Sequence, residues 1–187
     1  MCIRDRIIRE NESREEYVMS VAKAMMSAAR TAPKGCGVDN LEIAALGLSR
    51  LSRLARKMRE IGERDSKAFF LRDADNVENS QAVVLIGTRR AVRGLNCGLC
   101  GYPTCREKRD SAPAVPCVFD VTDLGIAVGS AVAIAADCRV DNRILYSAGV
   151  AAKELGFLDD CAIIYAVPLS VNGKNIYFDR FAKCGAK

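Results

Sequence analysis

The sequence predicts an α+β fold in which helices pack around a central β-sheet. Several segments repeat apolar residues at helical spacing, while residues 82–86 (AVVLI) and 162–167 are short, continuous apolar runs typical of buried strands. Residues 88–117 differ from the rest, because they are rich in Gly, Pro, Cys and Arg and show no period. For a chain of 187 residues we expect one domain, residues 1–187, with 88–117 as an inserted segment.

A first helix is predicted to begin near Arg14. Ser13 and Glu16 have the spacing of a capping box, in which each side chain satisfies a backbone N–H at the start of a helix. Apolar residues then recur at helical spacing, and Pro33 and Gly35 are expected to end the helix. A glycine-rich loop follows.

Residues 41–46 alternate weakly between apolar and polar side chains and predict a strand. A second helix is expected over 48–62, with apolar residues facing inward. Its outer face is basic. That face indicates either an ordinary solvated surface or a docking surface for an acidic redox partner. The basic residues are Arg50, Arg53, Arg56, Lys57 and Arg59.

The strand at 82–86 is expected to be covered on both faces, because its apolar run is continuous. The longest apolar run, 124–136, is predicted to be a buried helix; its 13 residues are too few to span a bilayer, so we expect no membrane partner. Gly125, Gly129 and Ala133 form a stripe of small residues along it. The stripe indicates either ordinary core packing or a dimer interface.

A further helix is predicted over 142–155, where Gly156 provides a C-cap signal. The strand at 162–167 should be broken by Pro168, since proline donates no backbone hydrogen bond. Residues 176–178 predict a short final strand after an Asn-Gly turn.

The composition excludes some kinds of chemistry. The chain contains no histidine, which removes imidazole bases, Ser-His and Cys-His pairs and every His-containing metal site. The 28 basic residues exceed the 23 acidic ones by five, but only 6% of residues are aromatic and no basic-aromatic motif is present. We therefore expect no nucleic-acid partner.

The nine cysteines cannot all form disulfides with one another, because nine is odd. Residues 4–9 carry four charges around two apolar residues, which is not typical of a secretory signal. We expect a cytoplasmic protein, where clustered cysteines usually indicate metal or redox chemistry.

One cysteine motif stands out. Its spacing is C-x2-C-x4-C-x11-C, and four thiolates in one short segment can hold a four-coordinate metal or a cubane cluster. Gly98 and Gly101 let backbone N–H groups face sulfur without side-chain clashes. The predicted ligands are Cys97, Cys100, Cys105 and Cys117.

Charge does not distinguish zinc from iron–sulfur, because both four-thiolate centres carry a charge of about minus two and either would be stabilised by nearby cations. Residues 89–109 contain six basic residues and one acidic residue. Zinc ribbons usually show two C-x2-C pairs, whereas this chain has one. The pattern favours iron–sulfur.

The string CGLCGYPTC resembles the core of the 4Fe-4S domain found in electron-transport and corrinoid iron–sulfur proteins of anaerobes. In that domain the fourth cysteine follows after a longer gap than the 11 residues here. The whole chain is also similar to a prokaryotic family described as ferredoxin-domain proteins. The segments that carry this likeness are TAPKGCGVDN, CGLCGYPTC, DLGIAVGSA, DNRILYSAGVAAKELG and PLSVNGKNIYFDR.

A wider resemblance is to the nitroreductase fold, in residues 28–33 (AARTAP), in 151–156 (AAKELG) and in the Pro168-Leu169 pair. It implies a sandwich of helices around a mixed central sheet, a homodimer, and FMN bound at the dimer interface. The loop after Pro33 usually supplies Asn and Gln to the flavin, but here it reads KGCGVD.

Three residues are candidates to hold a flavin phosphate. Lys34 places a cation, and Gly35 a backbone N–H, in the loop after the first helix. The alternative for this loop is an ordinary glycine turn at the helix end. Arg180 lies in a basic C-terminal segment.

Three functions are consistent with these features. The preferred one is an iron–sulfur oxidoreductase that passes electrons between a [4Fe-4S] cluster and a partner protein or a bound flavin. The second is a non-catalytic electron carrier or redox sensor, and the third is a zinc-stapled interaction protein. No motif identifies a substrate or a catalytic residue.

Overall fold

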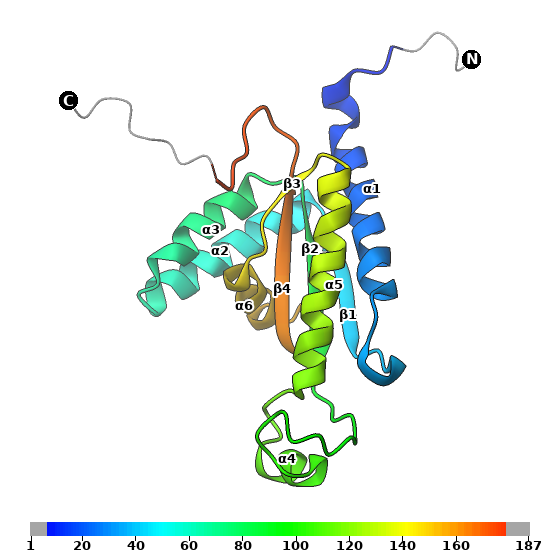
Figure 1. The fold of residues 1–187 in the computed structure, drawn as a ribbon. Helices are drawn as coiled ribbons and strands as arrows, with labels where there is room; N and C mark the ends of the chain where they lie inside the picture. The colour runs from blue at the N-terminus through cyan, green and yellow to red at the C-terminus, as the bar shows by residue number, and fades with distance from the viewer. Residues whose placement is uncertain (1–6, 179–187) are drawn as a thin grey trace, which may run out of the picture.

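The computed structural model describes residues 7–178 and confirms the α+β class (Figure 1). Four strands form one sheet in the order β1-β2-β4-β3. They are β1 (Leu41–Leu46), β2 (Ala82–Arg89), β3 (Asp141–Asn142) and β4 (Cys161–Ser170). Every pairing among these strands is antiparallel, so the sheet differs in this respect from the mixed sheet that we expected.

Helices cover both faces of the sheet (Figure 1). α1 (Glu10–Thr31) and α5 (Val118–Asp137) pack together on one face. α2 (Leu48–Arg64), α3 (Ala68–Glu78) and α6 (Tyr146–Glu154) cover the other. The result is a three-layer sandwich.

The continuous apolar run in β2 follows from this arrangement. Ala82, Val84 and Ile86 belong to the core shared with α1 and α5, while Val83 and Leu85 belong to the core under α2, α3 and α6. All five are fully buried. Because successive side chains point to opposite faces, a strand between two helical layers must be apolar at every position.

The expected capping box is wrong. α1 begins at Glu10, and the Ser13 hydroxyl lies inside the helix, 3.2 Å from the Glu10 carbonyl oxygen to which it donates. A mid-helix serine often bonds to a carbonyl one turn earlier in this way. Two acidic residues in the first turn, Glu10 and Glu12, stabilise this helix end through the helix dipole instead.

Pro168 does not break β4. It pairs in register with Val83 of β2. Two residues earlier, Ala166 exchanges both backbone hydrogen bonds with Leu145 on the other side of β4. Pro168 lacks an N–H toward that same side, but β3 has already ended at Asn142, so no bond is lost there.

Three other boundaries differ from expectation. α3 was not predicted, although its buried Phe70, Ala74 and Val77 have helical spacing. α6 begins later than predicted, at Tyr146, because residues 141–142 pair with β4 instead. The expected strand at 176–178 is a turn.

α5 is longer than predicted and exposes one of its faces. It begins at Val118, six residues before the expected start. Within the described chain, the stripe of Gly125, Gly129 and Ala133 lies on the surface and is not part of the core. By length and composition α5 could cross a membrane, but core helices of soluble proteins pass the same test.

The cysteine-rich segment projects beyond one end of the sandwich (Figure 1). It leaves β2 after Arg89, contains the short helix α4 (Cys105–Ser111), and returns at the N-terminus of α5. Both of its ends are therefore anchored to core elements.

Candidate metal centre

The chain from β2 to α4 is a folded loop with turns at defined positions. Asn96, Gly98 and Gly101 have positive φ angles of 47°, 73° and 85°. The Gly101 N–H donates to the Gly98 carbonyl over 2.9 Å and closes a tight turn around Cys100. Glycine adopts such angles without steric cost, which explains why the motif places glycine next to its cysteines.

The third cysteine is fixed by the start of α4. Thr104 caps this helix: its side-chain oxygen accepts the Glu107 N–H at 3.1 Å. The side-chain oxygen of Asn96 accepts the Cys105 N–H at 2.8 Å, and the Asn96 N–H lies 3.4 Å from the Cys105 sulfur to which it donates. These contacts tie α4 to the preceding loop.

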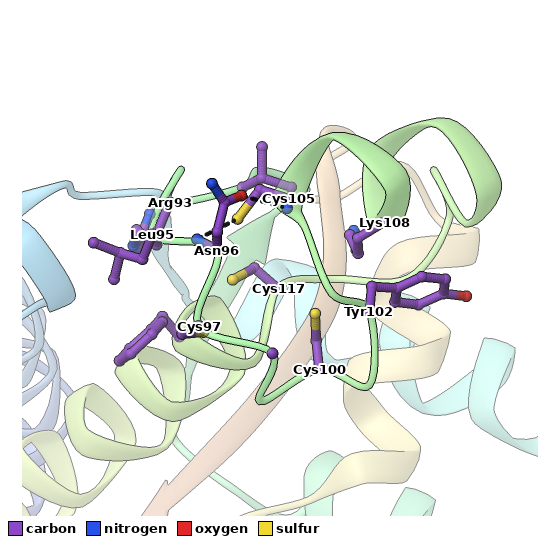
Figure 2. Close-up of a pocket in the computed structure, with 12 residues that line it drawn as sticks. Arg93, Leu95, Asn96, Cys97, Cys100, Tyr102, Cys105, Lys108 and Cys117 are labelled. Carbon is purple, nitrogen blue, oxygen red and sulfur yellow. Dashed lines mark hydrogen bonds between the residues drawn. The ribbon is translucent and has the colours of Figure 1, made fainter.

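All four predicted cysteine ligands line one pocket (Figure 2). Cys97 and Cys100 come from the loop, Cys105 begins α4, and Cys117 is the N-cap of α5. The fold thus brings Cys117, which lies 12 positions after Cys105 in the sequence, to the same pocket as the other three cysteines. Cys117 is buried, Cys100 and Cys105 are partly exposed, and Cys97 is exposed, so the pocket opens to solvent on one side.

All seven cysteines in the described part of the chain are free thiols. Across residues 7–178, no three Cys, Asp, Glu or His side chains are arranged to hold a single metal ion. To bind a single metal ion, the four sulfur atoms would therefore have to move closer together.

A buried charge network lies beside this pocket, and the sequence analysis did not detect it. The Arg93 side chain, which also lines the pocket, is only 2% exposed. Its Nη1 is 3.0 Å from Asp120 Oδ1 and its Nη2 is 2.5 Å from Asp123 Oδ2. Asp120 and Asp123 belong to the first turns of α5 and are themselves buried.

Both carboxylates also accept hydrogen bonds from neutral N–H donors. Asp120 accepts the Asn40 side-chain amide at 2.9 Å and the Ala91 N–H at 3.2 Å. Asp123 accepts the Gly35 N–H at 3.0 Å. Buried charges of this kind are tolerated only when they are paired and hydrogen-bonded. The network fixes the cysteine-rich segment to α5 and to the loop after α1.

A second buried cation lines the same pocket. Lys108 is 3% exposed although it belongs to a short surface helix, and its ammonium donates to the Val115 carbonyl. In the sequence, Arg93 and Lys108 are two of the six basic residues of segment 89–109. Their burial could not be recognised there, because lysine and arginine are rarely buried.

The candidate flavin residues already have protein partners. The Lys34 ammonium donates to the carbonyls of Ala29, Arg30 and Ala32 and so caps the C-terminus of α1. The Gly35 N–H is bound by the Asp123 carboxylate. With these contacts the loop matches the glycine-turn alternative. Arg180 lies outside the described residues.

Asp39 stabilises the same loop. Burial acts to raise the pKa of its carboxyl group, but the hydrogen bonds from Arg30 and from the Leu41 N–H outweigh this effect and lower the pKa below its usual range. The Arg30 Nη1 to Asp39 Oδ2 distance is 2.7 Å. The residue thus remains an anion that holds the end of α1 against the start of β1.

The loop after α1 lies next to the pocket. A methyl group on Gly35 would lie 3.1 Å from the Phe119 ring, and Phe119 also lines the cysteine pocket. The cysteine centre and this loop are therefore separated by a single aromatic side chain.

Comparison with solved structures places the chain among proteins of the nitroreductase fold. Nitroreductase A from Vibrio parahaemolyticus has 12% sequence identity and a TM-score of 0.52; the match covers 83% of this chain but only 59% of that one. A BluB-like flavoprotein from Clostridium difficile 630 has 16% identity and a TM-score of 0.55, with coverages of 91% and 84%. A nitroreductase with bound FMN from Desulfitobacterium hafniense has 13% identity and a TM-score of 0.56, with coverages of 83% and 78%.

Identities this low show a common fold and nothing more. A relative from Archaeoglobus fulgidus, described as "Uncharacterized protein", is far more similar: it is 41% identical over 185 residues, which are 95% of this chain and 99% of the relative. Residues 113–180 match a family model described as "Uncharacterized protein containing a ferredoxin domain". That match includes Cys117 but begins after the other three cysteines of the motif. The chain belongs to this ferredoxin-domain protein family and folds like a nitroreductase.

Proposed function

We propose that this protein is an iron–sulfur redox protein that exchanges single electrons with a partner through a [4Fe-4S] cluster held by four cysteines. The observation that carries the proposal is that all four thiols of the motif, from three separate elements, line one pocket together with two buried cations. The four ligands are Cys97, Cys100, Cys105 and Cys117.

The chemistry of the pocket fits such a cluster. A [4Fe-4S] cluster bound by four thiolates supplies reversible one-electron transfer and carries net negative charge. Lys108 brings positive charge to the same cavity, while Arg93, whose charge is offset by Asp120 and Asp123, brings buried N–H donors; both features would lower the cost of burying that anion. The Asn96 N–H already donates to the Cys105 sulfur over 3.4 Å, a contact of the kind that tunes iron–sulfur clusters.

The open side of the pocket gives a partner access. Cys97 is exposed, and Leu99 at the tip of the turn is 67% exposed. The side chains of Arg106 and Arg109 on α4 are 86% and 61% exposed, and the two share the single carboxylate of Asp110, so this surface keeps a net positive charge. We propose that an acidic redox protein docks here, because opposite charges steer and orient such encounters.

The basic face of α2 supports such a docking role less well. Arg59 there is ion-paired with Asp75 at 2.7 Å and with Glu78 at 2.6 Å. Arg50 and Arg53 lie over the Phe157 ring. These internal contacts are typical of a solvated surface.

A flavin-dependent oxidoreductase is the second candidate, favoured by the FMN-containing neighbours of this fold. The present contacts of Lys34 and Gly35 do not fit a flavin phosphate. The lysine is already bound by three carbonyls, and the Asp123 carboxylate at Gly35 would repel an anion. The electron-carrier function does not depend on FMN.

The test is anaerobic purification followed by quantification of iron, acid-labile sulfide, zinc and FMN per chain. We expect a brown protein with about four irons and four sulfides that bleaches with dithionite. Cys100→Ser should abolish iron uptake, whereas Cys36→Ser, a change at an exposed thiol outside the pocket, should leave it intact. A colourless zinc protein, or full iron retention in Cys100→Ser, would refute the proposal.

We further propose a homodimer formed through the outer face of α5. Gly125, Gly129 and Ala133 lie on this surface, beside Val121 and Ile126, which are 41% and 42% exposed. A strip of small residues flanked by apolar side chains would allow a second copy to approach closely, and burial of this face would stabilise the pair.

Gly129→Arg should convert the dimer to a monomer in analytical ultracentrifugation. Gly173→Arg is the matched control, because a Cβ atom added at either glycine meets no atom within 4 Å in the described chain. A wild-type protein that remains monomeric at 100 μM would contradict the dimer.

We place the protein in the cytoplasm, where reducing conditions keep the cysteines available as ligands.

A further inference from the structure

Arg93 has donor groups that no acceptor in the described chain satisfies. Its Nε is buried and has no hydrogen-bond partner. Its Nη1 lies 3.0 Å from Asp120 Oδ1, but the N–H bonds of that nitrogen are not directed at the oxygen, so it too has no hydrogen-bond acceptor. A buried charged donor without an acceptor is costly and rare in native proteins.

We propose that Arg93 donates an N–H hydrogen bond to a sulfur atom of the cluster and thereby raises its reduction potential. The inference rests on the proposed cluster and assigns to one residue the control of its redox behaviour. Arg93 lines the same pocket as the four cysteines, only four residues before Cys97 (Figure 2). The missing acceptor would be the anionic sulfur that fills this pocket.

Other polar side chains that line the pocket are less suited to this role. The amide oxygen of Asn96 is bound to the Cys105 N–H. The Lys108 ammonium donates to the Val115 carbonyl. Tyr102 turns its hydroxyl away from the cysteines (Figure 2). Arg93 thus combines burial, positive charge and unsatisfied donors.

The two carboxylates of α5 hold the guanidinium in place. Asp120 and Asp123 contact its terminal nitrogens and leave Nε unpaired. Both carboxylates are buried, so this arrangement is rigid and lies in an environment of low dielectric constant. A hydrogen bond to sulfur stabilises the more negative, reduced cluster more than the oxidised one, which raises the potential.

The experiment is an anaerobic redox titration of the reconstituted cluster, followed by electron paramagnetic resonance. Arg93→Lys keeps the charge but removes Nε–H. The double variant Arg93→Met/Asp123→Asn removes one positive and one negative charge, so the net charge of the network is unchanged while the guanidinium donors are lost. Arg106→Gln is the control for loss of an exposed cation near Cys105.

We expect the ratio of reduced to oxidised cluster at a fixed ambient potential to fall at least tenfold in both Arg93 variants, which corresponds to about 59 mV for one electron. The Arg106→Gln ratio should change less than twofold, because solvent screens an exposed charge.

Ratios within twofold of wild type in both Arg93 variants, with iron and sulfide retained, would overturn the inference. Loss of the cluster from both variants would also overturn it, because Arg93 would then be required to hold the cysteine-rich segment against α5 and its effect would not be on the potential. A wild-type protein without iron and sulfide would instead defeat the proposed function itself.

Discussion

Gly149 marks the closest approach between a helix and the sheet. It lies in α6, and a Cβ atom at this position would be 1.8 Å from the Ile164 carbonyl oxygen and 2.7 Å from the Ile164 carbonyl carbon of β4. Ordinary contact starts at about 3.4 Å. Gly149→Ala must therefore push α6 away from β4 by about 1.6 Å, the difference between 3.4 and 1.8 Å.

The cost of this shift can be worked out in order of magnitude. Overpacking a well-packed core typically costs about 1–3 kcal/mol, and more when backbone must move. The neighbouring Ala148, Ala151 and Ala152 are fully buried against the same sheet, so the shift opens gaps along the whole contact. The higher helix propensity of alanine offsets about 1 kcal/mol. Because the backbone of α6 must move, the overpacking cost should reach at least about 3 kcal/mol, which leaves a net loss of about 2 kcal/mol or more.

For a chain of this length, that loss lowers the melting temperature by about 4–8 °C. The assay is thermal and urea unfolding followed by circular dichroism. Gly173→Ala, in the surface turn after β4, is the control, since a Cβ there meets nothing within 4 Å, and it should change the free energy of unfolding by less than about 0.5 kcal/mol. If Gly149→Ala were as stable as wild type, the close packing of α6 on β4 would be refuted.

Three further outcomes follow from buried groups. Asp120→Ala should destabilise the protein by about 3 kcal/mol or more in urea unfolding, because it removes one of the two carboxylates that pair with the buried Arg93. The same change at the exposed Asp110 should cost less than about 1 kcal/mol. Equal effects would contradict the buried network. Burial raises the pKa of Tyr177 above its usual value near 10, so its contribution to the free energy of unfolding is complete below pH 10 and is lost above pH 10, where the unfolded chain releases the phenol proton. Tyr177→Phe should therefore reduce the loss of stability at alkaline pH. An unchanged dependence of stability on pH would exclude Tyr177 as its cause. Burial also raises the pKa of the Cys161 thiol, so iodoacetamide should label Cys161 only after unfolding. The exposed Cys36 should be labelled in the native protein, and mass spectrometry distinguishes the two sites. Similar labelling rates for the two cysteines in the native protein would show that Cys161 is accessible.

Local patterns predicted much of the secondary structure. β1, β2 and α2 lie close to where the sequence placed them, because an apolar run or a helical period is a property of neighbouring residues. The capping box at Ser13 failed for a related reason: the same four-residue spacing also occurs inside a helix. α3 was missed although Phe70, Ala74 and Val77 carry a helical period that could have revealed it.

Long-range contacts decided the features that local patterns misjudged. Pro168 fits in β4 because the neighbouring strand has already ended. The small-residue stripe of α5 lies on the surface, because the opposite face of that helix packs on α1 and the sheet.

At the candidate metal centre, the sequence by itself predicted the four sulfur ligands, because cluster chemistry requires a particular number and spacing of cysteines in one short segment. The tertiary structure alone decided the environment of those ligands. Arg93 meets Asp123 across 30 residues, and Gly35 meets the same carboxylate across 88. Groups so far apart in sequence become partners only after the chain has folded, and burial of the Arg93–Asp123 pair removes the solvent that would otherwise screen its charges.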